Sequence, residues 1–262
     1  MLSIRTLSKS FGGVTAVDEC SFDIARGSIT GLIGPNGAGK TTLFNIAAGF
    51  LKPDSGRILL DGQDITALSP HERFHLGLVR TFQLPQTFQR MTVRENLMVA
   101  PPEQSGENLF ATWFLPWKVA AEEKRVREKA DEVLDFLEIP HVADELAGNL
   151  SGGQKKLLEL GRCLMTDAKM VLLDEPGAGV NPTLMVKLTA MIRRLNEERG
   201  FTVCIIEHDM DVITELCDPV VCMSQGAVIA HGSMADIRAN EDVLEAYLGG
   251  GRAAAGRGGR AT

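Results

Sequence analysis

Short apolar segments alternate with amphipathic segments along most of the chain. Three nearly continuous apolar runs are predicted to be buried strands, at residues 28–33, 170–173 and 202–207. Helices are predicted over residues 42–50, 152–166 and 182–198. Buried strands that alternate with amphipathic helices are typical of a parallel sheet with helices on its faces. The pattern therefore predicts an α/β fold.

Two other regions show β character of a different kind. Residues 2–7, 14–24 and 56–61 are predicted to be strands of an antiparallel layer, with Gly12-Gly13 as the turn between the first two. Near the end of the chain, residues 219–231 are predicted to form a hairpin across Gln225-Gly226. We therefore expect an antiparallel subdomain beside the parallel sheet.

The middle of the chain is predicted to be helical, over residues 93–100 and 121–137. Between these helices lies the apolar segment 110–117, which holds both tryptophans, Trp113 and Trp117. This segment is interpreted either as a small hydrophobic cluster under a loop or as a surface that docks a partner.

Composition sets limits on the function. The chain has 262 residues and a net charge of −7, which argues against non-specific binding to nucleic acid or anionic lipid. Its five cysteines show neither a disulfide framework nor a zinc spacing, so buried reduced thiols are expected. No apolar run approaches the roughly 18 residues of a membrane span. Residues 249–262 contain mainly Gly, Ala and Arg, and a disordered basic tail is expected there.

The candidate chemistry begins in the loop after the first buried strand. Gly34, Gly39, Lys40 and Thr41 fill the fixed positions of the P-loop pattern GxxxxGK[ST]. Glycines let backbone N–H groups point at an anion, and the helix expected from Lys40 adds the positive end of its dipole. Lys40 can reach the β- and γ-phosphates, and the Thr41 hydroxyl can ligate Mg²⁺. We expect nucleotide contacts from Gly34, Pro35, Asn36, Gly37, Ala38, Gly39, Lys40, Thr41 and Thr42.

Two adjacent carboxylates, Asp174 and Glu175, end the second buried strand. Ligands of parallel sheets bind at the carboxyl ends of the strands. There Asp174 can hold Mg²⁺ alongside Thr41, and Glu175 can polarise a water for attack on the γ-phosphate.

A second anion cradle is predicted at Ser151, Gly152, Gly153 and Gln154, which open a helix. Ser151 is a good N-cap, and the two glycines leave backbone N–H groups open at the positive helix end. One nucleotide does not need two cradles. Two subunits packed head to tail would pair each P-loop with the cradle of the partner.

In their order along the chain, these motifs resemble those of the ATP-binding subunits of ABC transporters, over about residues 2–248. Phe11, Gln83 and His208 also fall at positions that match the family's motifs. The resemblance implies a P-loop NTPase (RecA-like) core, an antiparallel β subdomain and an ABC-specific helical subdomain at about 95–165. It also implies ATP and Mg²⁺ as cofactors and ATP hydrolysis as the reaction.

The same resemblance implies individual roles. Phe11 would stack on adenine, and Gln83 would contact Mg²⁺ and the attacking water. Ser151 and Gly153 would bind the γ-phosphate held by the opposite subunit, and His208 would contact the γ-phosphate. Each position has a structural alternative: core packing for Phe11, an exposed strand end for Gln83, and a helix cap for His208.

One departure from the family pattern is visible at Asn181, where many members carry an acid that helps to couple the two sites. An amide keeps the hydrogen-bonding geometry but not the charge.

Several runs are similar to those of branched-chain amino acid importers, namely 80–83, 147–154, 176–182 and 246–249. The resemblance implies an ATPase that powers such an importer, as a homodimer or with a paralogous subunit. Its partners would be integral membrane permeases and, indirectly, a periplasmic or extracellular binding protein. The subunit would be peripheral, on the cytoplasmic face of the cell membrane, without nucleic acid.

Other functions stay open at this stage. The alternatives within the family are importers of urea, amides or aromatic acids, exporters of lipid or lipopolysaccharide, and soluble ABC ATPases of DNA repair or translation. A P-loop kinase is the alternative outside the family, although it would have no use for residues 151–154.

Overall fold

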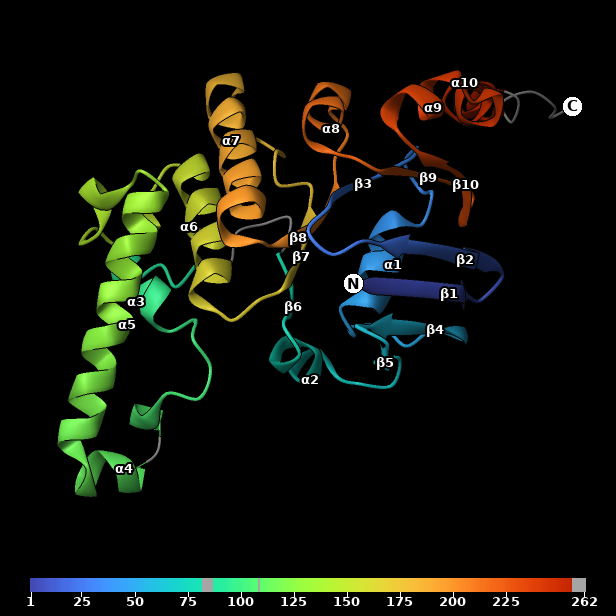
Figure 1. Ribbon diagram of the computed structural model, residues 1–262. Coiled ribbons are helices and arrows are strands. Elements are labelled where there is room, and N and C mark those ends of the chain that lie inside the picture. Colours follow the sequence, from blue (N-terminus) through green and yellow to red (C-terminus); the bar gives the residue numbers. More distant parts are fainter. Residues whose placement is uncertain (82–86, 108, 256–262) are drawn as a thin grey trace, which may run out of the picture. The chain divides into compact units, whose positions relative to one another are not determined.

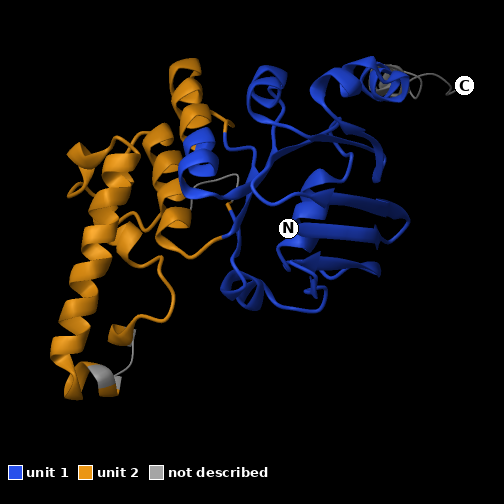
Figure 2. Cartoon of the chain, viewed as in Figure 1, with its two compact units in different colours: residues 1–80, 169–176, 192–262 blue, residues 81–168, 177–191 orange. Residues whose placement is uncertain are grey.

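The structure is a computed structural model and describes residues 1–81, 87–107 and 109–255. The chain forms two compact units (Figure 2). The first unit contains residues 1–80, 169–176 and 192–262, and the second contains residues 81–168 and 177–191. Strands that pair in the first unit therefore come from distant parts of the sequence.

Among the described residues, the first unit contains a six-stranded sheet in the order β10-β9-β3-β8-β7-β6 (Figure 1). Its strands are β3 (Ile29–Ile33), β6 (Leu78–Arg80), β7 (Met170–Asp174), β8 (Thr202–Ile206), β9 (Val220–Ser224) and β10 (Ala227–Gly232). Neighbouring strands are parallel except in the β9–β10 hairpin. Every residue of β3, β7 and β8 is buried, which confirms the predicted parallel sheet of buried strands.

A second sheet of the same unit is antiparallel, with the order β2-β1-β4-β5. It contains β1 (Leu2–Phe11), β2 (Val14–Ile24), β4 (Ser55–Leu60) and β5 (Gln63–Asp64). Figure 1 shows this sheet beside the helix α1 (Lys40–Ala47). The structure thus confirms the antiparallel layer predicted from the alternating pattern.

One hydrophobic core joins the two sheets to α1. Leu43 and Ile46 of α1 are buried in the same cluster as Ile4 of β1 and Cys204 of β8. All five cysteines are free and buried, as the sequence predicts. Burial in this core fixes α1, and with it the loop that precedes α1, against β3.

The remaining helices of the first unit are α2 (Pro70–His75), α8 (Met210–Leu216), α9 (Met234–Ala239) and α10 (Glu241–Ala255). Helix α10 includes residues 249–255, where the composition predicts a disordered tail. Residues 256–262 lie outside the described part of the chain.

The second unit is helical in its described residues. It contains α3 (Val93–Met98), α4 (Leu109–Phe114), α5 (Pro116–Phe136) and α6 (Gly152–Met165), with 3₁₀ turns at Ser105–Glu107, Pro140–Val142 and Ala147–Asn149. Helix α7 (Pro182–Arg199) begins in this unit and ends in the first. Helix α5 begins at Pro116 rather than at residue 121, because proline suits the first turn of a helix.

The aromatic side chains of the apolar segment face solvent. Phe110, Trp113, Phe114 and Trp117 are all exposed, Trp113 to 81%. This exposure contradicts the interpretation of the segment as a buried cluster. No helix among the described residues is long and apolar enough to cross a membrane.

Candidate functional site

The P-loop lies between the buried strand β3 and the helix α1. Gly34 has a φ of 147°, and a Cβ atom built on it would lie 2.1 Å from the carbonyl oxygen of Met223. Gly39 has a φ of 98°, and its Cβ would lie 2.1 Å from the carbonyl oxygen of Ala16. Both positions therefore require glycine, for backbone conformation and for space.

The amine of Lys40 lies inside this loop. Its Nζ donates hydrogen bonds to the carbonyl oxygens of Gly34, at 2.7 Å, and Pro35, at 3.1 Å. Burial lowers the pKa of Lys40, and the nearby carboxylates Glu175 and Asp174 partly oppose that shift. No side chain caps the N-terminus of α1, whose N-cap residue is Gly39. A cation and an uncapped helix N-terminus thus meet in one loop, which suits the binding of an anion.

Asp174 ends β7 and is almost fully buried. Its Oδ2 accepts a hydrogen bond of 2.7 Å from Nη2 of Arg80, whose Nη1 also donates to Oδ1 of Asn45 at 2.6 Å. Arg80 thereby ties β7 to the P-loop helix α1. The other carboxylate oxygen, Oδ1 of Asp174, is buried and has no hydrogen-bond partner among the described residues. A buried carboxylate oxygen without a hydrogen-bond partner is suited to bind a hard cation such as Mg²⁺.

Glu175 and His208 meet at the carboxyl ends of β7 and β8. These strands are paired in parallel with Asp174 opposite Ile206, so the residues that follow them are neighbours. Nε2 of His208 lies 2.9 Å from Oε1 of Glu175. Glu175 has a positive φ of 48°, a conformation that costs a non-glycine residue on the order of 1–3 kcal/mol. Its amide donates to the carbonyl oxygen of Ile206 at 2.9 Å, which helps to hold that conformation.

The structure excludes the structural alternatives stated for two single residues, His208 and Phe11. The cap of α8 is Asp209, whose carboxylate accepts hydrogen bonds from the amides of Asp211 and Val212, so His208 is not needed for that purpose. The side chain of Phe11 is 49% exposed at the end of β1, which excludes core packing. Gln83 lies outside the described residues.

The second predicted cradle lies in the second unit, at the start of α6. The hydroxyl of Ser151 accepts a hydrogen bond from the amide of Gln154, whose side chain accepts one from the amide of Ser151. Ser151 and Gly152 are exposed, whereas Gly153 is buried. A Cβ on Gly153 would lie 1.4 Å from Cδ2 of Leu184. A side chain at position 153 would therefore displace the Leu184 side chain of α7.

Asn181 has a local structural role as well. Its Oδ1 accepts a hydrogen bond of 2.9 Å from the amide of Leu184, so its side chain caps the N-terminus of α7. This bond uses the amide oxygen, and a carboxylate could accept it equally well.

The fold and the loop geometry define a P-loop nucleotide-binding protein. A family model described as "ABC transporter" matches residues 17–178, and one described as "Branched-chain amino acid ATP-binding cassette transporter" matches residues 227–253. The chain belongs to the ABC transporter family, as one of its ATP-binding cassettes, and is an ATPase subunit of a transporter.

Curated relatives and solved structures agree with this family. A probable branched-chain amino acid transport ATP-binding protein of Archaeoglobus fulgidus is 45% identical over 95% of both chains. A high-affinity branched-chain amino acid transport ATP-binding protein of Pseudomonas aeruginosa is 40% identical, over 95% of this chain and 98% of the relative. A crystal structure of an ATP-binding cassette in its ADP conformation is 40% identical, covers 95% of this chain and 98% of its own, and superposes with a TM-score of 0.80.

These findings confirm the predicted family, fold class and ATPase activity. The structure also reveals residues that sequence reasoning missed. Arg80 and Asn45 connect the P-loop helix to Asp174, although Arg80 and Asp174 lie 94 positions apart in the chain. No local pattern indicates such a pair.

Proposed function

We propose that this chain is the ATP-hydrolysing subunit of an importer of branched-chain or related amino acids. The observation that carries the proposal is the meeting of Lys40, Asp174, Glu175 and His208 at the carboxyl edge of one parallel sheet. The names of the relatives, together with the match over residues 227–253, support the class of substrate.

The P-loop is the part of the site that binds the phosphates. Its open backbone N–H groups and the Lys40 amine donate to phosphate oxygens, and the dipole of α1 favours their negative charge. Phe11, exposed at the end of β1, offers its ring to the adenine. Asp174 and the Thr41 hydroxyl would hold Mg²⁺, which when bound offsets charge on the β- and γ-phosphates.

Glu175 is the proposed base for hydrolysis. Its carboxylate accepts a proton from the water that attacks the γ-phosphorus, while the bond to the ADP oxygen breaks. His208 contacts this carboxylate directly and holds it in place. The backbone strain at Glu175 is consistent with a residue held for chemistry rather than for stability.

Two chains are proposed to complete each site. Ser151 and Gly152 are exposed at the N-terminus of α6, where backbone N–H groups favour an anion. A second copy, or a paralogous subunit, would place this cradle against the γ-phosphate. Permease subunits would bind the dimer at the cytoplasmic face of the membrane, and a binding protein would deliver the substrate.

Glu175→Gln tests this function. The variant removes the base but keeps the shape of the side chain, so ATP should still bind, while turnover should fall by about 10²–10⁴-fold. Because bound ATP is then not consumed, the variant should accumulate as a dimer on a sizing column. Glu128→Gln is the matched control, because Glu128 lies on α5, and it should leave turnover unchanged. Normal turnover in Glu175→Gln would remove Glu175 from the mechanism.

The class of substrate is tested by transport. The chain is reconstituted in vesicles with the permease subunits that co-purify with it and with their binding protein. ATP-dependent uptake of labelled leucine, competed by isoleucine and valine, is the predicted result. Uptake of urea or an aromatic acid in place of leucine would contradict the amino acid assignment and leave the ATPase role intact.

A further inference from the structure

Arg80 and Asp174 form an ion pair at the edge of the proposed magnesium site. Nη2 of Arg80 donates to Oδ2 of Asp174 at 2.7 Å, and both side chains are almost fully buried. The two charges of such a pair interact strongly, because water and salt screen a buried pair little. The negative charge of Asp174 is therefore already matched before any metal binds.

The guanidinium of Arg80 also contacts two neutral groups. Its Nη1 donates to Oδ1 of Asn45 on α1 at 2.6 Å, and its Cζ lies 5.9 Å from the centre of the Phe50 ring. Neither an amide nor an aromatic ring carries a formal negative charge that would compete with Asp174. These contacts hold the positive charge of Arg80 beside the Asp174 carboxylate.

The ion pair leaves one carboxylate oxygen for a metal. Oδ1 of Asp174 is buried and has no hydrogen-bond partner among the described residues, so it is the available ligand atom. A divalent cation at this oxygen is attracted by the carboxylate and repelled by the guanidinium, and the two effects largely cancel. Lys40 and Glu175 add one charge of each sign to the same site, so they do not restore the attraction.

We propose that Arg80 is a positioning residue that keeps Asp174 from binding Mg²⁺ until the nucleotide is bound. The inference rests on the proposed nucleotide site and adds an order of binding: the metal enters with the nucleotide and not before it. The phosphates of ATP bring the negative charge that the ion pair lacks. Arg80 also occupies Oδ2, so Asp174 offers the metal one oxygen rather than two.

Metal binding to the nucleotide-free protein tests this role. Mn²⁺ is the probe, because it takes oxygen ligands as Mg²⁺ does and its free concentration is measured by electron paramagnetic resonance. The wild type should bind Mn²⁺ weakly. Arg80→Gln removes the positive charge but keeps an amide that can donate a hydrogen bond, and it should bind Mn²⁺ at least about 10-fold more tightly. Arg80→Lys keeps the charge and should resemble the wild type.

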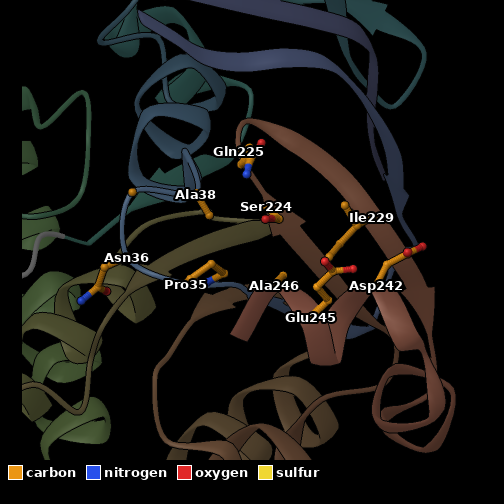
Figure 3. Close-up of a pocket in the computed structure, with 10 residues that line it drawn as sticks. Pro35, Asn36, Ala38, Ser224, Gln225, Ile229, Asp242, Glu245 and Ala246 are labelled. Carbon is orange, nitrogen blue, oxygen red and sulfur yellow. The ribbon is translucent and has the colours of Figure 1, made fainter. Parts of the chain in front are cut away.

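Other carboxylates near the P-loop must be separated from Asp174. Asp242 and Glu245 of α10 line a pocket of about 470 Å³ together with residues 35–38 of the loop (Figure 3). Mn²⁺ bound in that pocket would not depend on the Arg80–Asp174 pair. Arg80→Gln combined with Glu245→Gln should therefore keep the tighter Mn²⁺ binding, whereas Arg80→Gln combined with Asp174→Asn should lose it.

Thermal unfolding of the nucleotide-free protein gives a second readout. A metal that replaces the guanidinium as counter-ion should raise the Tm of Arg80→Gln by about 2–4 °C in millimolar Mn²⁺ and leave that of the wild type nearly unchanged. Equal Mn²⁺ affinities of Arg80→Gln and the wild type would overturn the proposal. An Arg80→Gln chain that Mn²⁺ neither stabilises nor recovers in folded form would overturn it as well. Failure of the wild-type protein to bind ADP in the presence of Mg²⁺ would instead refute the proposed nucleotide site itself.

Discussion

Replacement of Arg80 by methionine should remove a large part of the free energy of unfolding. The Arg80 and Asp174 side chains are only 6% and 2% exposed, and their charged groups lie 2.7 Å apart. The substitution would leave the carboxylate of Asp174 buried without its counter-ion. Removal of one partner from a buried ion pair costs about 3–5 kcal/mol, because the remaining charge is uncompensated.

This loss is large compared with the total free energy of unfolding of a domain. Domains are stable by only about 5–15 kcal/mol, so a loss of about 3–5 kcal/mol in Arg80→Met would be roughly a fifth or more of the free energy of unfolding. The Arg80 fork also joins Asn45 of α1 to Asp174 of β7. A lysine keeps the charge but cannot reach both groups in this geometry, so Arg80→Lys should give a smaller loss, of about 1–2 kcal/mol.

Urea denaturation followed by circular dichroism measures these losses. Arg193→Met is the matched control, because Arg193 pairs with Glu215 at 3.2 Å on the surface, where its side chain is 40% exposed. Exposed pairs contribute roughly 0–1 kcal/mol, so the control should stay close to the wild type. A loss in Arg80→Met no larger than that of the control would refute the argument that this pair ties the P-loop helix to the sheet.

Two further predictions concern the loop and the helix caps. Gly34→Ala should weaken ADP binding by at least about 10-fold, because its Cβ would collide with the Met223 carbonyl. Gly13→Ala is the control and should bind ADP normally, because a Cβ at Gly13 lies in open space. Equal ADP affinities of the two variants would contradict the geometry of the loop. Hydrogen bonds from Ser69 lower the pKa of Glu72 from 4.5, so the stability that these bonds add is present above pH 4.5 and is lost as the pH falls through the lowered folded-state pKa. Glu72→Gln keeps an acceptor for these bonds but does not titrate, so its urea midpoint should fall less steeply below pH 4.5 than that of the wild type; parallel curves would show that Glu72 does not contribute.

The sequence predicted the elements whose pattern is local. The three predicted buried runs correspond to β3, β7 and β8, and the predicted glycine pattern corresponds to the loop before α1. Local rules were less accurate at the element ends. Helix α5 begins at Pro116, because proline suits the first turn of a helix, and α10 continues to Ala255 although Gly249, Gly250 and Gly251 disfavour helix.

Contacts between distant residues could not be predicted in the same way. The sequence places Glu175 and His208 after different strands, and only the parallel register of β7 and β8 brings them within 2.9 Å. The parallel pairing of β6 with β7 places Arg80 opposite Leu172, two residues before Asp174, and the long Arg80 side chain reaches the Asp174 carboxylate from there.

We propose that each hydrolytic site needs a cradle from a second chain. The most direct measurement is ATP turnover per chain as a function of protein concentration, from far below to far above the concentration at which dimers form. Turnover per chain should rise with concentration and then reach a plateau, and Ser151→Ala should lower the plateau. Full turnover per chain in a strictly monomeric sample, independent of concentration, would contradict it.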